Sequence, residues 1–160
     1  MRIVVHAVGR MKAGPERELS ARYFERFSRA GPPLGLDFAG VREIAESRAS
    51  GAERRKAEEA EPLLRMAADG ALLVLLDETG KSLSSEDFAG RLAGFRDEGR
   101  RDLVLAIGGP DGHDPALRRE SGLLLSFGRM TWPHQVARIL LAEQLYRACT
   151  ILSGHPYHRA

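Results

Sequence analysis

ALLVLLD, residues 71–77, and DLVLAIG, residues 102–108, are the two stretches that decide the fold. Each is a continuous apolar run of strand length, which is typical of a strand covered by helices on both faces. Further strands are predicted over residues 2–8, 36–44 and 123–127. Because stretches with a helical pattern lie between these runs, the chain is predicted to be an α/β protein with a parallel sheet.

The helical stretches carry recognisable start and stop signals. Pro15 is expected to open a helix with one apolar face. Residues 51–68 are helical in composition, and Pro62 is expected to break or kink that helix. Ser84 and Asp114 are expected to cap the starts of two more helices.

Size and composition narrow the class of protein. A chain of 160 residues is long enough for one domain, predicted to span residues 1–160. Its 43% hydrophobic and 29% charged residues are typical of a globular protein and argue against disorder. No signal peptide or membrane span is recognised, so a cytoplasmic protein is expected. Cys149 stands alone, which excludes an intrachain disulfide and favours a buried thiol.

Charge gives a weaker indication of the partner. The formal net charge is only +2, and a modest excess of basic residues lies in the last third of the chain. This bias is compatible with an RNA or phosphate partner, and equally with scattered solvated charge. The spacing of the histidines offers no tetrahedral ligand set, so no metal site is predicted.

Three loops follow the predicted strands at their carboxyl ends, where open α/β sheets bind ligands. They are DETGK (77–81), IGGPDGHD (107–114) and SFGRMTWPH (126–134). The glycines of the second loop would let backbone approach a ligand, although glycines after a strand are often plain turn residues. Phe127, Met130 and Trp132 could wall a pocket for a flat ring such as adenine, or could plug the core. Thr131 is expected to cap the following helix.

The helix predicted from Pro133 to Leu152 is apolar on nearly every face. The sheet can cover only one side of such a helix, so a homodimer with this helix in the interface is predicted. Glu143 and Arg147 are expected to pair at i, i+4. Arg138 is a lone charge among apolar residues and requires an anionic partner, a carbonyl or a phosphate.

Several of these stretches together resemble one family. IGGPDGHD, LSFGRMTWPHQVARILLAEQLYRACTILSGHPYH, HAVGRMK and LLDETGKSLSSEDFA resemble the RlmH family across the whole chain. These are SPOUT-superfamily methyltransferases that modify a pseudouridine of large-subunit ribosomal RNA at N3. The resemblance implies a parallel-sheet SPOUT fold with a C-terminal trefoil knot, the cofactor S-adenosylmethionine, a homodimer, and the assembled ribosome as substrate. The implied cofactor contacts are Leu76, Gly108, Phe127, Gly128, Arg129, Met130, Thr131 and Trp132.

Catalytic roles are hypotheses that combine the resemblance with the chemistry of the C-terminal tail, GHPYHRA. Arg138 would orient the nucleotide, and His158 or Tyr157 would assist removal of the imide proton or position the base. Alternatively, the tail only seals the dimer or contacts phosphate. No chemistry is assigned to His113, because the family varies there, and Trp132 is bulkier than the expected Leu or Phe.

Two other functions remain open from the sequence. One is a SPOUT methyltransferase that acts on tRNA, which the absence of an appended RNA-binding domain disfavours. The other is a ribosome-associated factor without enzymatic activity, which the intact cofactor-loop residues disfavour.

Overall fold

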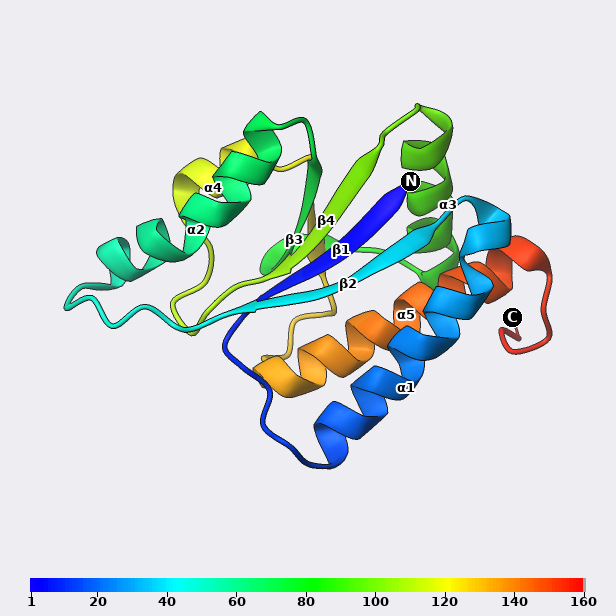
Figure 1. Ribbon diagram of the computed structural model, residues 1–160, viewed down its shortest axis with the longest axis horizontal. Coiled ribbons are helices and arrows are strands. Elements are labelled where there is room, and N and C mark those ends of the chain that lie inside the picture. Colours follow the sequence, from blue (N-terminus) through cyan, green and yellow to red (C-terminus); the bar gives the residue numbers. More distant parts are fainter. Residues whose placement is uncertain (160) are drawn as a thin grey trace.

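The apolar runs form a parallel sheet in the computed structural model, which describes residues 1–159. Within that range the sheet has five strands in the order β2-β1-β4-β3-β5, and every neighbouring pair is parallel (Figure 1). This confirms the predicted α/β class. The strands are β1 (Arg2–Val8), β2 (Asp37–Ile44), β3 (Leu72–Ser82), β4 (Asp102–Ile107) and β5 (Leu123–Ser126).

Helices cover both faces of the sheet. Figure 1 shows α1, α3 and α5 on one face and α2 and α4 on the other. This two-sided cover explains the continuous apolar runs over residues 72–76 of β3 and 103–107 of β4. The helices are α1 (Pro15–Ala30), α2 (Ala52–Ala68), α3 (Ser85–Asp97), α4 (Pro115–Glu120) and α5 (His134–Ser153), and the 3-10 turn η1 covers Pro32–Leu34.

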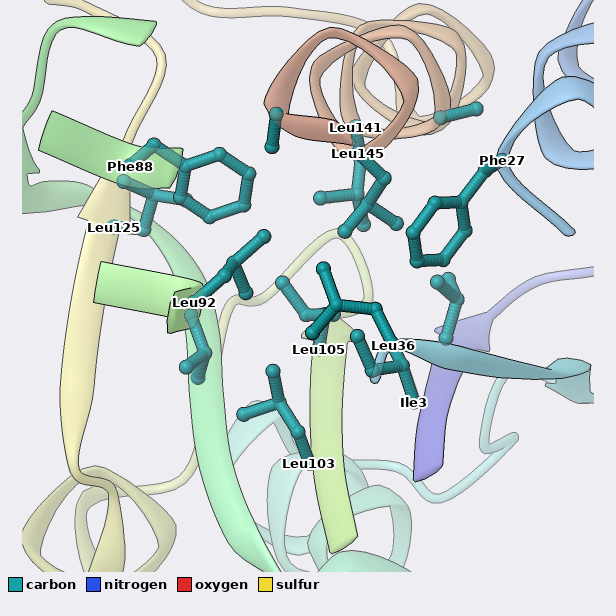
Figure 2. Packing of buried hydrophobic residues seen from close by; sticks show 14 of the residues in the cluster. Ile3, Phe27, Leu36, Phe88, Leu92, Leu103, Leu105, Leu125, Leu141 and Leu145 are labelled. Carbon is teal, nitrogen blue, oxygen red and sulfur yellow. The ribbon is translucent and has the colours of Figure 1, made fainter. Parts of the chain in front are cut away.

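Alternate side chains of each strand enter two separate cores. On β1, Ile3 and Val5 face α1, α3 and α5, whereas Val4 faces α2 and α4. Burial of each such side chain stabilises the fold by about 1.5–3 kcal/mol. Figure 2 shows the larger core, where helix and strand side chains meet: Phe27, Phe88, Leu141 and Leu145 against Ile3, Leu103 and Leu105.

β3 is longer than predicted, and its extension shapes the molecule at the sheet edge. Leu76 and Lys81 both pair with Leu125 of β5, so the residues between them bulge out of the ladder. Gly80 makes this possible, because a Cβ there would lie 2.6 Å from the carbonyl carbon of Leu124. The segment expected to be a loop after Asp77 is therefore a bulge inside the strand.

Two expectations about the helices were wrong: a break at Pro62 and a cap at Thr131. α2 continues through Pro62, where Ala60 and Leu63 are buried in the smaller core, and the alternative of a kink stays a prediction. This packing outweighs the cost of about 3 kcal/mol for an interior proline. α5 begins at His134 with no side-chain cap, so Thr131 does not cap it; the carbonyl of Pro133 accepts the first helical hydrogen bond.

Two further features follow from the packing. Cys149 is buried, and burial raises the pKa of its thiol to about 12, so the thiol stays protonated at neutral pH. No helix within residues 1–159 is long and apolar enough to cross a membrane.

Candidate active site

A cleft of about 850 Å³ lies at the carboxyl ends of β3, β4 and β5. The bulge of β3, the loop after β4 and the loop after β5 each contribute walls, and the first turn of α5 contributes His134 and Ala137. The three loops singled out in the sequence therefore converge on one cavity. Its volume lies within the range of about 300–1,000 Å³ that is usual for small-molecule sites.

The loop after β4, residues 107–114, presents its glycines to the cleft through a tight turn. The N–H of Gly112 donates to the carbonyl of Gly109 at 2.9 Å, and Gly112 has a φ of 80°, which favours glycine. Asp111 lies at the tip of the turn. Arg55 of α2, which does not line the cleft, donates two hydrogen bonds of 2.7 and 3.0 Å to its carboxylate. A Cβ on Gly109 would lie 2.5 Å from Oε2 of the buried Glu59, so α2 packs directly behind this loop.

His113 joins two walls of the cleft, a role that the sequence interpretation missed. Its Nε2 donates to the carbonyl of Leu76 at 3.0 Å, which ties the loop after β4 to β3. Burial lowers the pKa of His113, so the ring is neutral at pH 7. The ring also packs under Gly108, where an added Cβ would lie 3.0 Å from it. A histidine directly after a glycine turn at a strand end was the available signal.

The bulge of β3 is held by a network that was also missed. Asp77 accepts hydrogen bonds from the backbone N–H and the hydroxyl of Thr79 at 2.9 and 2.7 Å. Arg118 of α4 donates to both Asp77 and Thr79 at 2.8 Å. Although burial opposes it, these contacts hold the pKa of Asp77 below its usual range, so the carboxylate is charged at neutral pH.

The loop after β5 supplies the apolar wall. Phe127, Gly128, Met130, Thr131 and Trp132 all line the cleft, as does Leu76. Met130 and Trp132 are 74% and 42% exposed, so they border an open cavity and do not plug the core. Arg129, the remaining member of the implied cofactor set, is exposed and does not line the cleft. The indole N–H of Trp132 donates to the carbonyl of Phe127 at 3.3 Å.

Arg138 lies outside this cleft, which changes its expected role. The side chain is buried on α5, where it pairs with Glu43 of β2 and donates to the carbonyl of Gly9 at 3.0 Å. The sequence prediction that Arg138 needs an anion or a carbonyl is confirmed. Its role in orienting a nucleotide stays a prediction; Nε of the guanidinium has no hydrogen-bond partner within residues 1–159.

The C-terminal tail packs near the far end of α5. Tyr157 donates to Glu143 at 3.0 Å, and Nε2 of His158 lies 2.7 Å from Glu86 of α3. Glu143 also pairs with Arg147 at 2.6 Å, as its spacing predicted. Nδ1 of His158 lies 3.3 Å from Arg147, which follows the cleft residue Ala137 by about ten residues, or roughly 15 Å along the helix axis. Neither Tyr157 nor His158 lines the cleft of its own chain.

The cleft offers no metal centre among the residues that the structure describes, since no group of three candidate ligands gathers within residues 1–159.

Comparison with known proteins decides the family. The family model described as predicted SPOUT methyltransferase matches residues 1–158. The chain belongs to the SPOUT methyltransferase family. It is 67% identical to a Brucella anthropi protein and 62% identical to a Mesorhizobium japonicum protein, over the full length of each pair. Both relatives are named ribosomal RNA large subunit methyltransferase H.

Solved structures of SpoU proteins are more distant from this SPOUT methyltransferase. The SpoU methyltransferase AviRb from Streptomyces viridochromogenes, in complex with AdoMet, is 15% identical with a TM-score of 0.40, covering 92% of this chain and 59% of that one. The TrmH/SpoU tRNA modifying enzyme of A. aeolicus is 12% identical with a TM-score of 0.46, covering 96% of this chain and 77% of that one.

Proposed function

We propose that this SPOUT methyltransferase transfers a methyl group from S-adenosylmethionine to N3 of a pseudouridine in large-subunit ribosomal RNA, with the assembled ribosome as substrate. The observation that carries the proposal is the full-length identity of 67% and 62% to relatives named ribosomal RNA large subunit methyltransferase H. The cleft supports it, because its walls come from the loops that the resemblance assigns to the cofactor.

The residues present suit S-adenosylmethionine. Gly128 has a φ of 106° and open space where a Cβ would stand, which leaves backbone accessible in the cleft. His134 lines the cleft with a buried Nδ1 that has no hydrogen-bond partner within residues 1–159, so it is available to a polar ligand. Leu76, Phe127 and Trp132 would hold the adenine side. Gly108, Met130 and Thr131 complete the proposed set, and Arg129 is left out.

The chemistry requires little beyond positioning and removal of one proton. S-adenosylmethionine, when bound, supplies a sulfonium-activated methyl group. The protein must align the nucleotide nitrogen with that methyl group and accept the imide proton of N3. Burial, followed by contacts with Tyr23 and Glu143, raises the pKa of Tyr157, so its phenol stays protonated. We therefore assign the proton acceptor to His158 and base positioning to Tyr157.

A homodimer would bring this tail to a cleft. Several apolar side chains of α5 are only partly buried in a single chain: Val136, Ile139, Leu140, Ile151 and Leu152. Pairing two copies through α5 would cover these side chains and could place the tail of one subunit over the cleft of the other. The distance between tail and cleft within one chain supports this arrangement. In such a dimer, Arg138 in the first turns of α5 would help to position the nucleotide.

The cofactor assignment can be tested directly, because Trp132 is the single tryptophan of the chain and borders the cleft. Titration with S-adenosylmethionine should change the tryptophan fluorescence saturably. Gly128→Val should weaken the affinity at least tenfold, because valine strains a backbone with positive φ and enters the cleft. An unchanged affinity for Gly128→Val, in a variant that melts like the wild type, would remove this loop from the cofactor site.

A further inference from the structure

The segment Gly9-Arg10-Met11-Lys12, here called the GRMK loop, joins β1 to α1 and has no role in the cleft. Met11 is only 7% exposed, and Ser20 of α1 donates to its sulfur at 3.6 Å. The residues on either side, Arg10 and Lys12, are exposed. Met11 thus anchors the loop from inside and leaves two cations directed to solvent.

Two hydrogen bonds from neighbouring elements hold the backbone of this loop. The carbonyl of Gly9 accepts from Arg138 at 3.0 Å, and the N–H of Met11 donates to Glu43 at 3.0 Å. Glu43 in turn pairs with Arg138. Although burial opposes it, the Met11 N–H and Arg138 lower the pKa of Glu43, which is therefore charged at neutral pH. The carboxylate of Glu43 is thus already bound to Arg138 and to the loop backbone.

The two cations of the GRMK loop are not paired with carboxylates. Some exposed arginines on the helices are, as in the pairs of Arg29 with Glu25 and Arg65 with Glu61. Arg10 and Lys12 form no ion pair with any of the described residues 1–159. Oε1 of Glu46 lies 3.3 Å from the place where a Cβ on Gly9 would stand. Neither Arg10 nor Lys12 is therefore held in an ion pair by a carboxylate of the described residues.

The loop lies at the same sheet edge as the cleft. β1 is the direct neighbour of β4, with Ala7 opposite the cleft residue Ile107. On α5, Ala137 lines the cleft and the next residue, Arg138, binds the loop. Figure 1 shows the chain after β1 passing beside the start of α5. The loop is thus held by the residue of α5 that directly follows a cleft residue.

We propose that the GRMK loop is a docking surface for the phosphate backbone of the RNA substrate, with Arg10 and Lys12 each contacting one phosphate. The inference rests on the proposed function, since the cleft must receive a nucleotide whose flanking phosphates lie close by. A rigid loop with outward cations is suited to this task, because phosphate contacts fix the register of a nucleic acid without reading its sequence.

The test compares Arg10→Ala/Lys12→Ala with the control Arg29→Ala/Arg65→Ala, which removes the same charge from helix surfaces. Methyl transfer is measured at graded ribosome and salt concentrations. The loop variant should raise KM for ribosomes about tenfold and leave kcat and the cofactor affinity reported by Trp132 unchanged. Its salt dependence should weaken by about 0.7–0.9 in log–log slope per lost phosphate contact. The control should match the wild type in all of these, and Arg10→Lys/Lys12→Arg should restore wild-type values.

Three results would overturn the inference: an unchanged KM, an equal rise in the control, or an unchanged salt slope. Direct binding of purified large-subunit ribosomal RNA separates an RNA contact from a contact with an acidic protein. If the variant binds this RNA like the wild type but binds ribosomes weakly, the partner of the loop is a protein and the proposal fails. If the wild-type protein methylates no ribosomal RNA, the proposed function fails instead. The comparison of RNA binding between the wild type and the loop variant then still tests whether the loop contacts RNA.

Discussion

His6 shows how one buried side chain on β1 links folding to pH. It is 2% exposed, and its Nδ1 has no hydrogen-bond partner within residues 1–159. Burial, followed by the positive charge of Arg42 and the proximity of His113, lowers the pKa of His6 to about 4. An unfolded histidine titrates near pH 6.5. Between pH 6.5 and 4 the imidazole of His6 is therefore protonated in the unfolded chain and neutral in the folded chain.

The free energy of unfolding should consequently fall as the pH drops through this window. His6 alone should remove about 3 kcal/mol between pH 6.5 and 4 and should contribute no pH dependence above pH 6.5. Urea unfolding of wild type and His6→Leu at pH 7 and pH 4.5 measures this. The variant should lose less stability on acidification, with a remainder from His113, whose pKa burial also lowers. Parallel losses in both proteins would contradict the assignment.

The role of a single residue was predictable where its partner is close in sequence, or where a buried charge requires a partner. The spacing of Glu143 and Arg147 predicted their ion pair, and the isolation of Arg138 among apolar residues predicted that it must be engaged. The roles of Asp77 and His113 could not be predicted. Each depends on a partner from another element, Arg118 for one and the carbonyl of Leu76 for the other.

At the scale of elements, α2 serves as the support of the loop after β4. Arg55 and Glu59 lie one helical turn apart on one face. Arg55 bonds Asp111 twice and also donates to the carbonyl of Ala49 at 3.1 Å. Glu59 packs behind Gly109 and accepts from the N–H of Ser47 at 2.9 Å. Neither residue lines the main cleft, so both act by positioning the loop.

Loss of the contact between Arg55 and Asp111 should weaken cofactor binding, although Arg55 itself does not contact the cofactor site. Arg55→Ala should reduce the affinity for S-adenosylmethionine several-fold in the Trp132 fluorescence titration, because the turn at Asp111 loses its anchor. Arg54→Ala is the matched control, since within residues 1–159 Arg54 forms its ion pair with the exposed Glu58 of the same helix. Arg55→Lys should recover part of the affinity. Equal affinities for Arg55→Ala and Arg54→Ala would show that the ion pair does not position the loop.

Strands and helices were predictable where the sequence pattern that marks them lies within the element itself. The apolar runs located β1 and β4 within a residue, because continuous burial leaves a clear mark on the sequence. The bulge in β3 was missed, since it depends on the close approach of Gly80 to β5, which lies far along the chain. The break expected at Pro62 is absent, because packing near it outweighs its local effect.

At the scale of the whole molecule, the class of the fold was predictable and the path of the chain was not. Alternating strands and helices indicated a parallel sheet, but no local signal sets the order β2-β1-β4-β3-β5. The trefoil knot implied by the family resemblance stays a prediction, because threading is a property of the entire path. The convergence of three loops on one cleft follows from the parallel arrangement, which brings all strand ends to one edge.

The protein is proposed to transfer methyl groups to large-subunit ribosomal RNA from a cofactor bound in this cleft. An assay of labelled methyl transfer tests this directly. Wild-type protein and His158→Ala are incubated with S-adenosylmethionine labelled in its methyl group, and with ribosomes, separated subunits and free ribosomal RNA in parallel. We expect label in large-subunit RNA from assembled ribosomes with the wild type, and a loss of at least a hundredfold with His158→Ala, in line with general acid–base contributions of about 10²–10⁴. Label that appears only in tRNA or small-subunit RNA, or no label from a protein that binds the cofactor, would contradict it.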